Sequence, residues 1–307
     1  MINRIFYIFF KSMSYIPLPV GRFIGRILGT LFLLAPSRRK EVSIDNIRES
    51  FGDSMGRKEI KRLNRKVVFH FAQMIFEVPH VLRMNMGNLE RYITFGHEEN
   101  LYKALKKGKG AFILTGHFGN WEMMSTAASL YFGNLAVVAR PFDFQPLDRF
   151  MNDLRSMFGA EIIPKQKGMR RLLNANKREM VIGILLDQNV DWYEGVFVNF
   201  LGRRACANKG LALLALRTGT PVIPAFPVRQ KNGRYHVSLG DEVQLIRTGD
   251  KTKDIEENTA LFTGIIEDYI RRYPDHWFWF HMRWKTRPYC RLPDGFYRKQ
   301  GASISGT

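Results

Sequence analysis

The sequence predicts an α/β protein whose central sheet is mostly parallel or mixed and is covered by helices on both faces. Short apolar runs such as 111–115 and 135–139 alternate with longer segments that carry helical apolar spacing. This alternation is typical of strands and crossover helices in parallel sheets. The composition is globular rather than disordered, with 45% hydrophobic and 24% charged residues.

The first 36 residues are predicted to form an apolar, amphipathic, membrane-associating helical segment, separate from a single α/β domain over residues 37–307. Lys11, Arg22 and Arg26 interrupt the segment, and its longest uncharged run is 27–37. That run is far shorter than the roughly 18 to 20 residues that a membrane-spanning helix needs. No small-residue cleavage site follows the first short apolar run, which disfavours a signal peptide. Apolar and basic faces favour a retained segment in the membrane interface, and a helix pair packed on the domain is the alternative.

The elements of the domain are expected in the following order. Residues 54–83 carry helical apolar spacing, and His70 and His80 lie among the apolar positions, where we expect them in the core. A helix near 97–107 leads to 111–115, a continuous apolar strand of the buried kind. Helices and strands then alternate: helix 120–132, strand 135–139, a helix ending near 158, strands 160–164 and 180–186, helix 209–219 and strand 221–228.

Later strands are expected within 233–246, followed by an amphipathic helix near 252–273. The chain then has an aromatic and basic stretch, 276–288. Trp and Tyr beside basic residues are frequent at membrane interfaces, so this stretch could form an interfacial belt. Packing in the core is an equal alternative.

The charge of the chain is strongly positive. It has 47 Lys and Arg against 28 Asp and Glu, a net charge of +19, which predicts attraction to an anionic partner such as phospholipid, nucleic acid or an acidic protein. The two cysteines, Cys206 and Cys290, lie far apart without a CxxC motif. This argues against a disulfide framework or a zinc site and fits a reducing compartment. No metal site is predicted.

One histidine stands where an α/β enzyme places its reactive groups. His117 follows the predicted strand 111–115 and a glycine, and a helix follows it at once. Ligands of open α/β sheets bind outside the carboxyl ends of the strands. His236 and Asp241 have the same five-residue spacing as His117 and Glu122, but His236 lies inside an alternating strand pattern. We therefore discount the second pair.

The predicted chemistry of His117 and Glu122 is general-base catalysis. Residues five apart in one helix point to different faces, so the two can meet only if His117 precedes the helix and Glu122 lies on its first turn. Glu122 would then accept the proton of one imidazole nitrogen and leave the other as a base. Backbone N–H groups near 118–120, or an arginine, would hold an oxyanion. A helix N-cap histidine without a catalytic role is the alternative.

No nucleophile or cofactor motif competes with this pair, since GxSxG, P-loop, GxGxxG and HExxH patterns are all missing from the sequence. A His–acid pair without a nucleophile suits the removal of a proton from a substrate hydroxyl that attacks an activated acyl group.

The motif around His117 and several later segments resemble a known family, the bacterial lipid A biosynthesis acyltransferases (lauroyl and myristoyl transferases). This family belongs to the wider group of HX4D/E glycerolipid acyltransferases. The resemblance covers most of the chain. It rests on "GHFGNWE" (116–122), the Arg-Pro segment 137–159, the Asp-Gln segment 184–226 and the Trp-rich stretch 276–288. The sequence departs from the family pattern at "ACANKG" (205–210), where a Thr-Pro usually precedes the glycine.

The resemblance implies a role for each matching residue. His117 would be the general base and Glu122 its orienting partner. The predicted substrate-binding residues are Arg140, Arg155, Asp187, Gln188 and Asn120. The acyl donor would be a thioester of acyl carrier protein or coenzyme A, with no further cofactor.

The acceptor would be the hydroxyl of a membrane lipid, first of all a lipid A precursor, at the cytoplasmic face of the inner membrane. A positively charged chain would be attracted to acyl carrier protein, anionic phospholipid and lipid phosphates alike. Other lipid acceptors (lysophosphatidate, an ornithine-type lipid, a phosphatidylinositol mannoside) remain open. So does a non-catalytic basic protein that binds membrane or nucleic acid, although no nucleic-acid partner is expected because its usual motifs are missing.

Overall fold

The computed structural model describes residues 2–287 except 53 and 167. Its centre is a seven-stranded sheet in the order β1-β9-β8-β2-β5-β3-β4, and every neighbouring pair is parallel except β8 and β9. The strands are β1 (Ile93–Gly96), β2 (Ala111–Thr115), β3 (Leu135–Ala139), β4 (Glu161–Pro164), β5 (Val181–Leu185), β8 (Val222–Arg229) and β9 (Tyr235–Leu239). The predicted α/β class with a mostly parallel sheet is confirmed.

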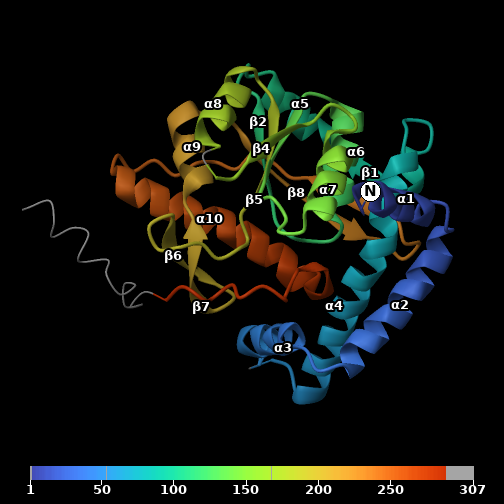
Figure 1. Ribbon diagram of the computed structural model, residues 1–307. Coiled ribbons are helices and arrows are strands. Elements are labelled where there is room, and N and C mark those ends of the chain that lie inside the picture. Colours follow the sequence, from blue (N-terminus) through green and yellow to red (C-terminus); the bar gives the residue numbers. More distant parts are fainter. Residues whose placement is uncertain (1, 53, 167, 288–307) are drawn as a thin grey trace, which may run out of the picture.

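Helices cover both faces of this sheet (Figure 1). Along β2, Phe112 and Leu114 enter one apolar core, whereas Ala111 and Ile113 enter another, because successive strand residues point to opposite faces. The first core is closed by α8 (Met169–Lys177), α9 (Gly210–Thr218) and α10 (Lys251–Arg272). The second is closed by α5 (Glu98–Leu105), α6 (Trp121–Phe132) and α7 (Gln145–Ser156).

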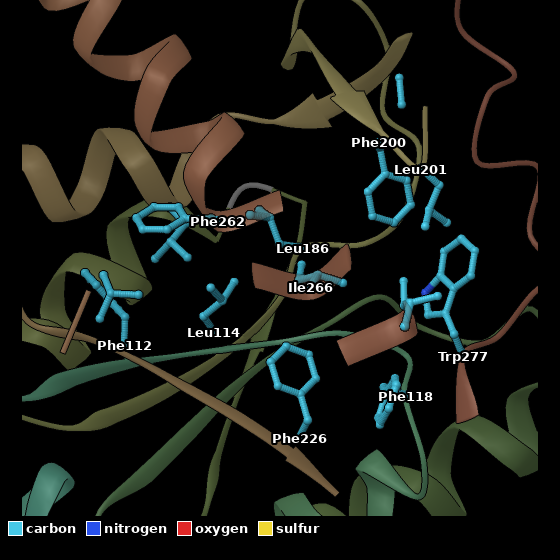
Figure 2. Close-up of a cluster of buried hydrophobic side chains, with 14 of the residues drawn as sticks. Phe112, Leu114, Phe118, Leu186, Phe200, Leu201, Phe226, Phe262, Ile266 and Trp277 are labelled. Carbon is cyan, nitrogen blue, oxygen red and sulfur yellow. The ribbon is translucent and has the colours of Figure 1, made fainter. Parts of the chain in front are cut away.

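The first core reaches the C-terminal aromatic stretch. Figure 2 shows Phe112, Leu114 and Phe226 facing Phe262 and Ile266 of α10, with Trp277 at one end of the cluster. Trp277 and Trp279 are 1% and 0% exposed. Of the two alternatives for this stretch, core packing is the one that the structure has for the residues up to 287, and residue 288 lies outside the described part. His70 and His80 are buried, as predicted.

The N-terminal residues form two helices, α1 (Ile2–Met13) and α2 (Leu18–Leu34), ahead of α3 (Arg38–Phe51) and α4 (Arg57–Glu77). Within the described residues, no single helix has both the length and the apolar character needed to cross a membrane. Arg4–Met13 and Leu18–Leu34 meet that criterion only as a pair bent by 113°. The helix α2 packs along α4, and α1 packs on α7 through Phe6, Phe10 and Phe150.

The two helices nevertheless leave an apolar outer face. On α2, Phe23 is 65% and Leu31 is 56% exposed, while the glycines of the opposite face contact α4. The helix pair is thus packed on the domain, and the membrane role of its outer face stays a prediction, as does the division at residue 36.

Several regions differ from the sequence prediction or were missed by it. Strands β6 (Gly195–Phe200) and β7 (Arg203–Asn208) form a separate antiparallel hairpin, and β1 was not expected. The region 233–246 contains one strand, β9, rather than several. The helix predicted over 54–83 ends as α4 at Glu77, and a 3₁₀ helix, Val78–Arg83, follows with Pro79 in its first turn.

Candidate active site

His117 lies in a short loop between β2 and α6, as the sequence predicted. Two backbone hydrogen bonds fix the loop to the stretch that follows α10. Phe278 N donates to His117 O (3.0 Å), and Gly119 N donates to His276 O (2.8 Å). Gly119 has a φ of 55°, and a Cβ there would meet the Pro227 carbonyl oxygen at 1.9 Å. Only glycine fits this turn. The backbone of the loop is therefore held in one place.

Asp187 holds the imidazole of His117. It follows β5, the strand beside β2, and its carboxylate oxygen Oδ1 lies 2.8 Å from His117 Nδ1. The other oxygen, Oδ2, accepts from His117 N (3.0 Å) and from Trp277 Nε1 (2.8 Å). Gly116 permits this approach, because a Cβ there would lie 3.1 Å from Asp187 Cγ. An ionised carboxylate only accepts, so Nδ1 carries the proton.

Burial alone would raise the pKa of Asp187. The charge and the hydrogen bonds of His117, together with the Trp277 N–H, outweigh that effect and lower the pKa to about 2. Asp187 is 3% exposed, so its charge is compensated almost wholly by protein groups. The carboxylate therefore stays ionised at neutral pH, and its contact with Nδ1 leaves Nε2 of the ring facing the site.

The predicted contact between Glu122 and His117 is wrong. Glu122 lies on the first turn of α6, but its carboxylate accepts from Arg155 Nε (2.8 Å), Arg155 Nη2 (2.5 Å) and Trp121 Nε1 (3.0 Å). The position on Nδ1 belongs to Asp187. Trp121 contacts both residues. Its indole N–H donates to Glu122, and its ring centroid lies 5.0 Å from that of the His117 imidazole in an edge-to-face arrangement. Glu122 thus touches the site through Trp121 and Arg155.

Gln188 approaches the free nitrogen of His117. Its amide Nε2 lies 3.2 Å from His117 Nε2. The imidazole side chain is 23% exposed whereas that of Asp187 is 2% exposed, so solvent reaches the ring but not the carboxylate behind it. A substrate hydroxyl that loses its proton to Nε2 would take the place of the Gln188 amide.

The other predicted site residues differ in their positions. Arg155 of α7 lies beside Glu122, and although burial opposes it, the hydrogen bond and charge of Glu122 raise the pKa of its guanidinium. Arg140 is exposed just after β3. Asn120 is fully buried and caps α6, since its Oδ1 accepts from Met123 N (3.0 Å). A direct substrate contact by Asn120 is therefore not supported.

The backbone donors expected for an oxyanion are largely occupied. Phe118 N donates to Gly116 O and Gly119 N donates to His276 O, both at 2.8 Å. Of the N–H groups near 118–120 that were predicted to hold an oxyanion, those of 118 and 119 are thus engaged within the loop. The alternative of an arginine stays a prediction. Among the side chains at the site, the Gln188 amide is a donor next to the reacting nitrogen.

The residues that pack behind Asp187 were not predicted from the sequence. Trp277 donates directly to the carboxylate. Arg283 is fully buried, donates from Nη1 to Cys206 O (2.6 Å) and lies over the Phe200 ring. Burial lowers the pKa of Arg283 to about 10, with Asp187 opposing the shift, so it remains a cation. The concentration of Trp, His and Arg in 276–287 was the available signal.

No group of three or more potential metal ligands is found within the residues that the structure describes. His236, whose pair with Asp241 was discounted above, lies in β9 with Nδ1 2.9 Å from Thr94 Oγ1.

These features define a class of enzyme. A buried carboxylate fixes the imidazole tautomer at the carboxyl ends of parallel strands, and the free nitrogen faces an amide rather than a nucleophile of the protein. This arrangement is suited to an α/β enzyme that activates a substrate hydroxyl by general-base catalysis.

The chain belongs to the bacterial lipid A biosynthesis acyltransferase family, whose sequence profile matches residues 2–286. It is thus an acyltransferase. A lipid A biosynthesis acyltransferase of Haemophilus influenzae is 25% identical over 92% of this chain and 90% of its own length. The Escherichia coli lipid A biosynthesis lauroyltransferase is 22% identical over 89% and 88%. A phosphatidylinositol mannoside acyltransferase of Mycolicibacterium smegmatis is 26% identical over 53% of this chain and 54% of its own.

Proposed function

We propose that the protein transfers a fatty acyl chain from an acyl thioester to a hydroxyl group of a membrane lipid, with a lipid A precursor as the first candidate acceptor. The observation that carries the proposal is the hydrogen bond between His117 Nδ1 and Asp187 Oδ1, 2.8 Å long, in an imidazole whose side chain is 23% exposed. Family membership sets aside the non-catalytic alternative.

In the proposed reaction, His117 Nε2 takes the proton of the acceptor hydroxyl as its oxygen attacks the thioester carbonyl carbon. Asp187 stabilises the imidazolium that forms, as in other carboxylate-supported histidines. The tetrahedral intermediate then expels the thiolate, which receives the proton from Nε2. The products are the lipid ester and the free thiol, and His117 returns to its starting protonation state. No acyl-enzyme is needed.

Gln188 and Arg155 are proposed to assist this reaction. The arriving hydroxyl displaces the Gln188 amide from His117 Nε2, and the freed N–H can donate to the oxyanion close by. Arg155 is kept in place by Glu122, with two hydrogen bonds to one carboxylate. His117 and Glu122, five residues apart in the sequence, therefore occupy two different positions in the site and share no hydrogen bond.

The donor is proposed to be acyl carrier protein or coenzyme A. Both are anionic, and the net charge of +19 favours the approach of either. The acceptor is proposed from the relatives, since lipid A biosynthesis enzymes match over about nine-tenths of this chain. A phosphatidylinositol mannoside is the second candidate, because the mycobacterial relatives match about half of the chain.

The enzyme is proposed to work at the cytoplasmic face of the inner membrane, where both substrates would meet. The outer face of α1 and α2 supports this. It carries large exposed apolar side chains, among them Ile5, Ile8, Phe9, Phe23, Ile27 and Leu31. An apolar helix face on a basic protein is suited to an anionic lipid surface.

The test uses purified protein in detergent with labelled lauroyl- or myristoyl-acyl carrier protein and a tetraacylated, Kdo-modified lipid A precursor. His117→Ala is expected to lower transfer by about 100- to 10,000-fold. His97→Asn is the control, because it removes an exposed histidine at the start of α5 and keeps a residue that tolerates its φ of 57°. Transfer retained by folded His117→Ala would contradict the proposed base. Product formed only with phosphatidylinositol mannoside or from coenzyme A thioesters would select those alternatives.

A further inference from the structure

A fully buried carboxylate, Glu77, lies at the end of α4 and takes no part in the chemistry described above. Its oxygen Oε1 accepts from Arg22 Nε (2.7 Å). Its other oxygen, Oε2, accepts from Arg229 Nη2 (2.8 Å) and Tyr235 Oη (2.8 Å). Asn120 Nδ2 also approaches Oε2, at 3.4 Å. Four separate segments of the chain therefore meet at one side chain that is 0% exposed.

The charge of Glu77 is stabilised by these partners. Burial would raise the pKa of Glu77, but the guanidinium groups of Arg229 and Arg22 outweigh burial and lower the pKa. Glu77 is thus ionised at neutral pH. Removing one partner of such a buried, hydrogen-bonded pair leaves a charge that is no longer compensated, so the groups around Glu77 must stay together.

Two connections lead from Glu77 to the loop that carries His117. The first is Asn120, which caps the helix that begins directly after the loop and faces Glu77 with its other side-chain atom. The second is Arg229, whose backbone N donates to His276 Nε2 (3.0 Å). The carbonyl of the same His276 accepts from Gly119 N (2.8 Å). Gly119 and Asn120, at the end of the 117–120 loop that leads into α6, are thus tied to groups that Glu77 contacts.

Arg22, the partner of Glu77 Oε1, comes from the N-terminal helix α2. Arg22 reaches inward from the helix, donates also to the carbonyl of Gly233, and its side chain is 19% exposed. The opposite face of α2 is the apolar outer face described above. One helix therefore carries both this exposed apolar face and a side chain that is bonded to the buried Glu77.

We propose that Glu77 is a positioning residue of the acyltransferase, and that Arg22 makes the docking of α2 a condition for the geometry of the His117 loop. The inference rests on the proposed role of His117 as the base. The helix α2 therefore contributes to catalysis, because its Arg22 compensates part of the charge of Glu77 next to the His117 loop.

The experiment compares Arg22→Gln with Arg26→Gln in detergent, using acyl carrier protein thioester and lipid acceptor. Arg26 lies one turn further along α2 and is exposed, so both variants lose one positive charge from the same helix. Arg22→Gln is expected to lower kcat by about 10- to 100-fold with little change in KM, because a small misplacement of a catalytic group has effects of this size. Arg26→Gln should stay within about twofold of the original kcat.

Further readouts separate positioning from loss of folding. Glu77→Gln keeps the shape of the side chain but replaces one accepting carboxylate oxygen with an NH2 donor. We expect it to lower kcat as Arg22→Gln does, with no further loss in the double variant. Arg22→Lys should restore part of kcat. The proton resonance of His117 Nδ1–H, observed by NMR, should shift in Arg22→Gln and not in Arg26→Gln.

Unchanged kcat and an unchanged His117 resonance in folded Arg22→Gln and Glu77→Gln would overturn the inference. Equal losses in Arg22→Gln and Arg26→Gln would overturn it as well, since charge alone would then explain them. If Arg22→Gln does not fold, Glu77→Gln decides by the same two readouts. Failure of the proposed base would be seen separately, as full activity of His117→Ala.

Discussion

At the scale of single residues, the site depends on a charge held away from water. Asp187 accepts three hydrogen bonds, from His117 Nδ1, His117 N and Trp277 Nε1. Such bonds to an ionised carboxylate stabilise it strongly in a region of low polarity. The same bonds orient the imidazole, so the stability of the loop and the state of the base have a common origin.

The lowered pKa of Asp187 predicts a specific dependence of stability on pH. The pKa is about 2 in the folded chain against an ordinary value of 3.8. A carboxyl with a lowered pKa stabilises the fold above its unfolded value, and this contribution is lost as the pH falls toward the folded value. The difference in unfolding free energy between the wild type and Asp187→Asn should therefore shrink between pH 5 and pH 2. Denaturant unfolding at several pH values measures it, and a constant difference would contradict the assignment.

Sequence reasoning found His117 and its place after β2, because an apolar strand, a glycine and a helix start are visible in the order of residues. It gave the wrong carboxylate, since spacing along one segment cannot reveal a partner that lies 70 residues away in the sequence. Asp187 and Gln188 came from the resemblance to the family and are both at the imidazole. The parallel pairing of β2 and β5 is what brings them together.

At the scale of elements, the N-terminal helix α2 lies unusually close to α4. Gly21, Gly25 and Gly29 face α4 at intervals of four residues, which places them on one side of the helix. A Cβ at position 25 would lie 2.8 Å from the Ala72 oxygen and 2.8 Å from Gln73 Cα. Both of these atoms belong to the backbone of α4, so a side chain at position 25 could not be accommodated by the movement of a neighbouring side chain alone.

This packing predicts that Gly25→Ala destabilises the protein by about 1–3 kcal/mol, the usual effect of overpacking. Gly264, inside α10, is the matched control because nothing lies within 4 Å of a Cβ built there. Gly264→Ala should instead stabilise by roughly 0.5–1 kcal/mol through lower backbone entropy of the unfolded chain. Unfolding free energies of the two variants test this. Equal effects would show that the α2–α4 contact is not tight.

The strands of the parallel sheet were the most predictable elements. The predicted strands 111–115 and 135–139 coincide with β2 and β3, because buried parallel strands are short, continuous apolar runs between loops. The hairpin β6–β7 was missed because its second strand, Arg203–Asn208, begins with two arginines and continues with small residues, which show no alternation of polar and apolar positions. The edge strand β1, only four residues long, has too few residues for a clear period.

At the scale of the whole molecule, the net charge and the exposed apolar residues both favour contact with an anionic lipid surface. The chain carries a net charge of +19, and the exposed apolar residues of α1 and α2 are concentrated in the N-terminal part of the chain. On the proposed membrane surface, this charge would attract the protein to an anionic bilayer over a range of about one Debye length. The apolar side chains would then add binding energy on contact.

The proposed membrane surface predicts that Phe23→Glu with Leu31→Glu lowers binding to vesicles of phosphatidylglycerol and phosphatidylethanolamine by about 10-fold or more, since two apolar contacts become charged. Met169→Glu on α8 is the control, because Met169 is 51% exposed and lies in another part of the chain. Co-sedimentation at low and high salt measures the binding. Undiminished binding by the double variant would place the membrane contact elsewhere.

The most direct test of the account is kcat for acyl transfer by Asp187→Asn, alone and combined with His117→Ala. If Asp187 acts by holding and stabilising the imidazole of His117, Asp187→Asn should lower kcat by about 100- to 10,000-fold. It should then have almost no further effect once His117 is alanine, because groups that act as a unit are not additive. Full activity of folded Asp187→Asn, or a loss that simply multiplies with that of His117→Ala, would contradict the account.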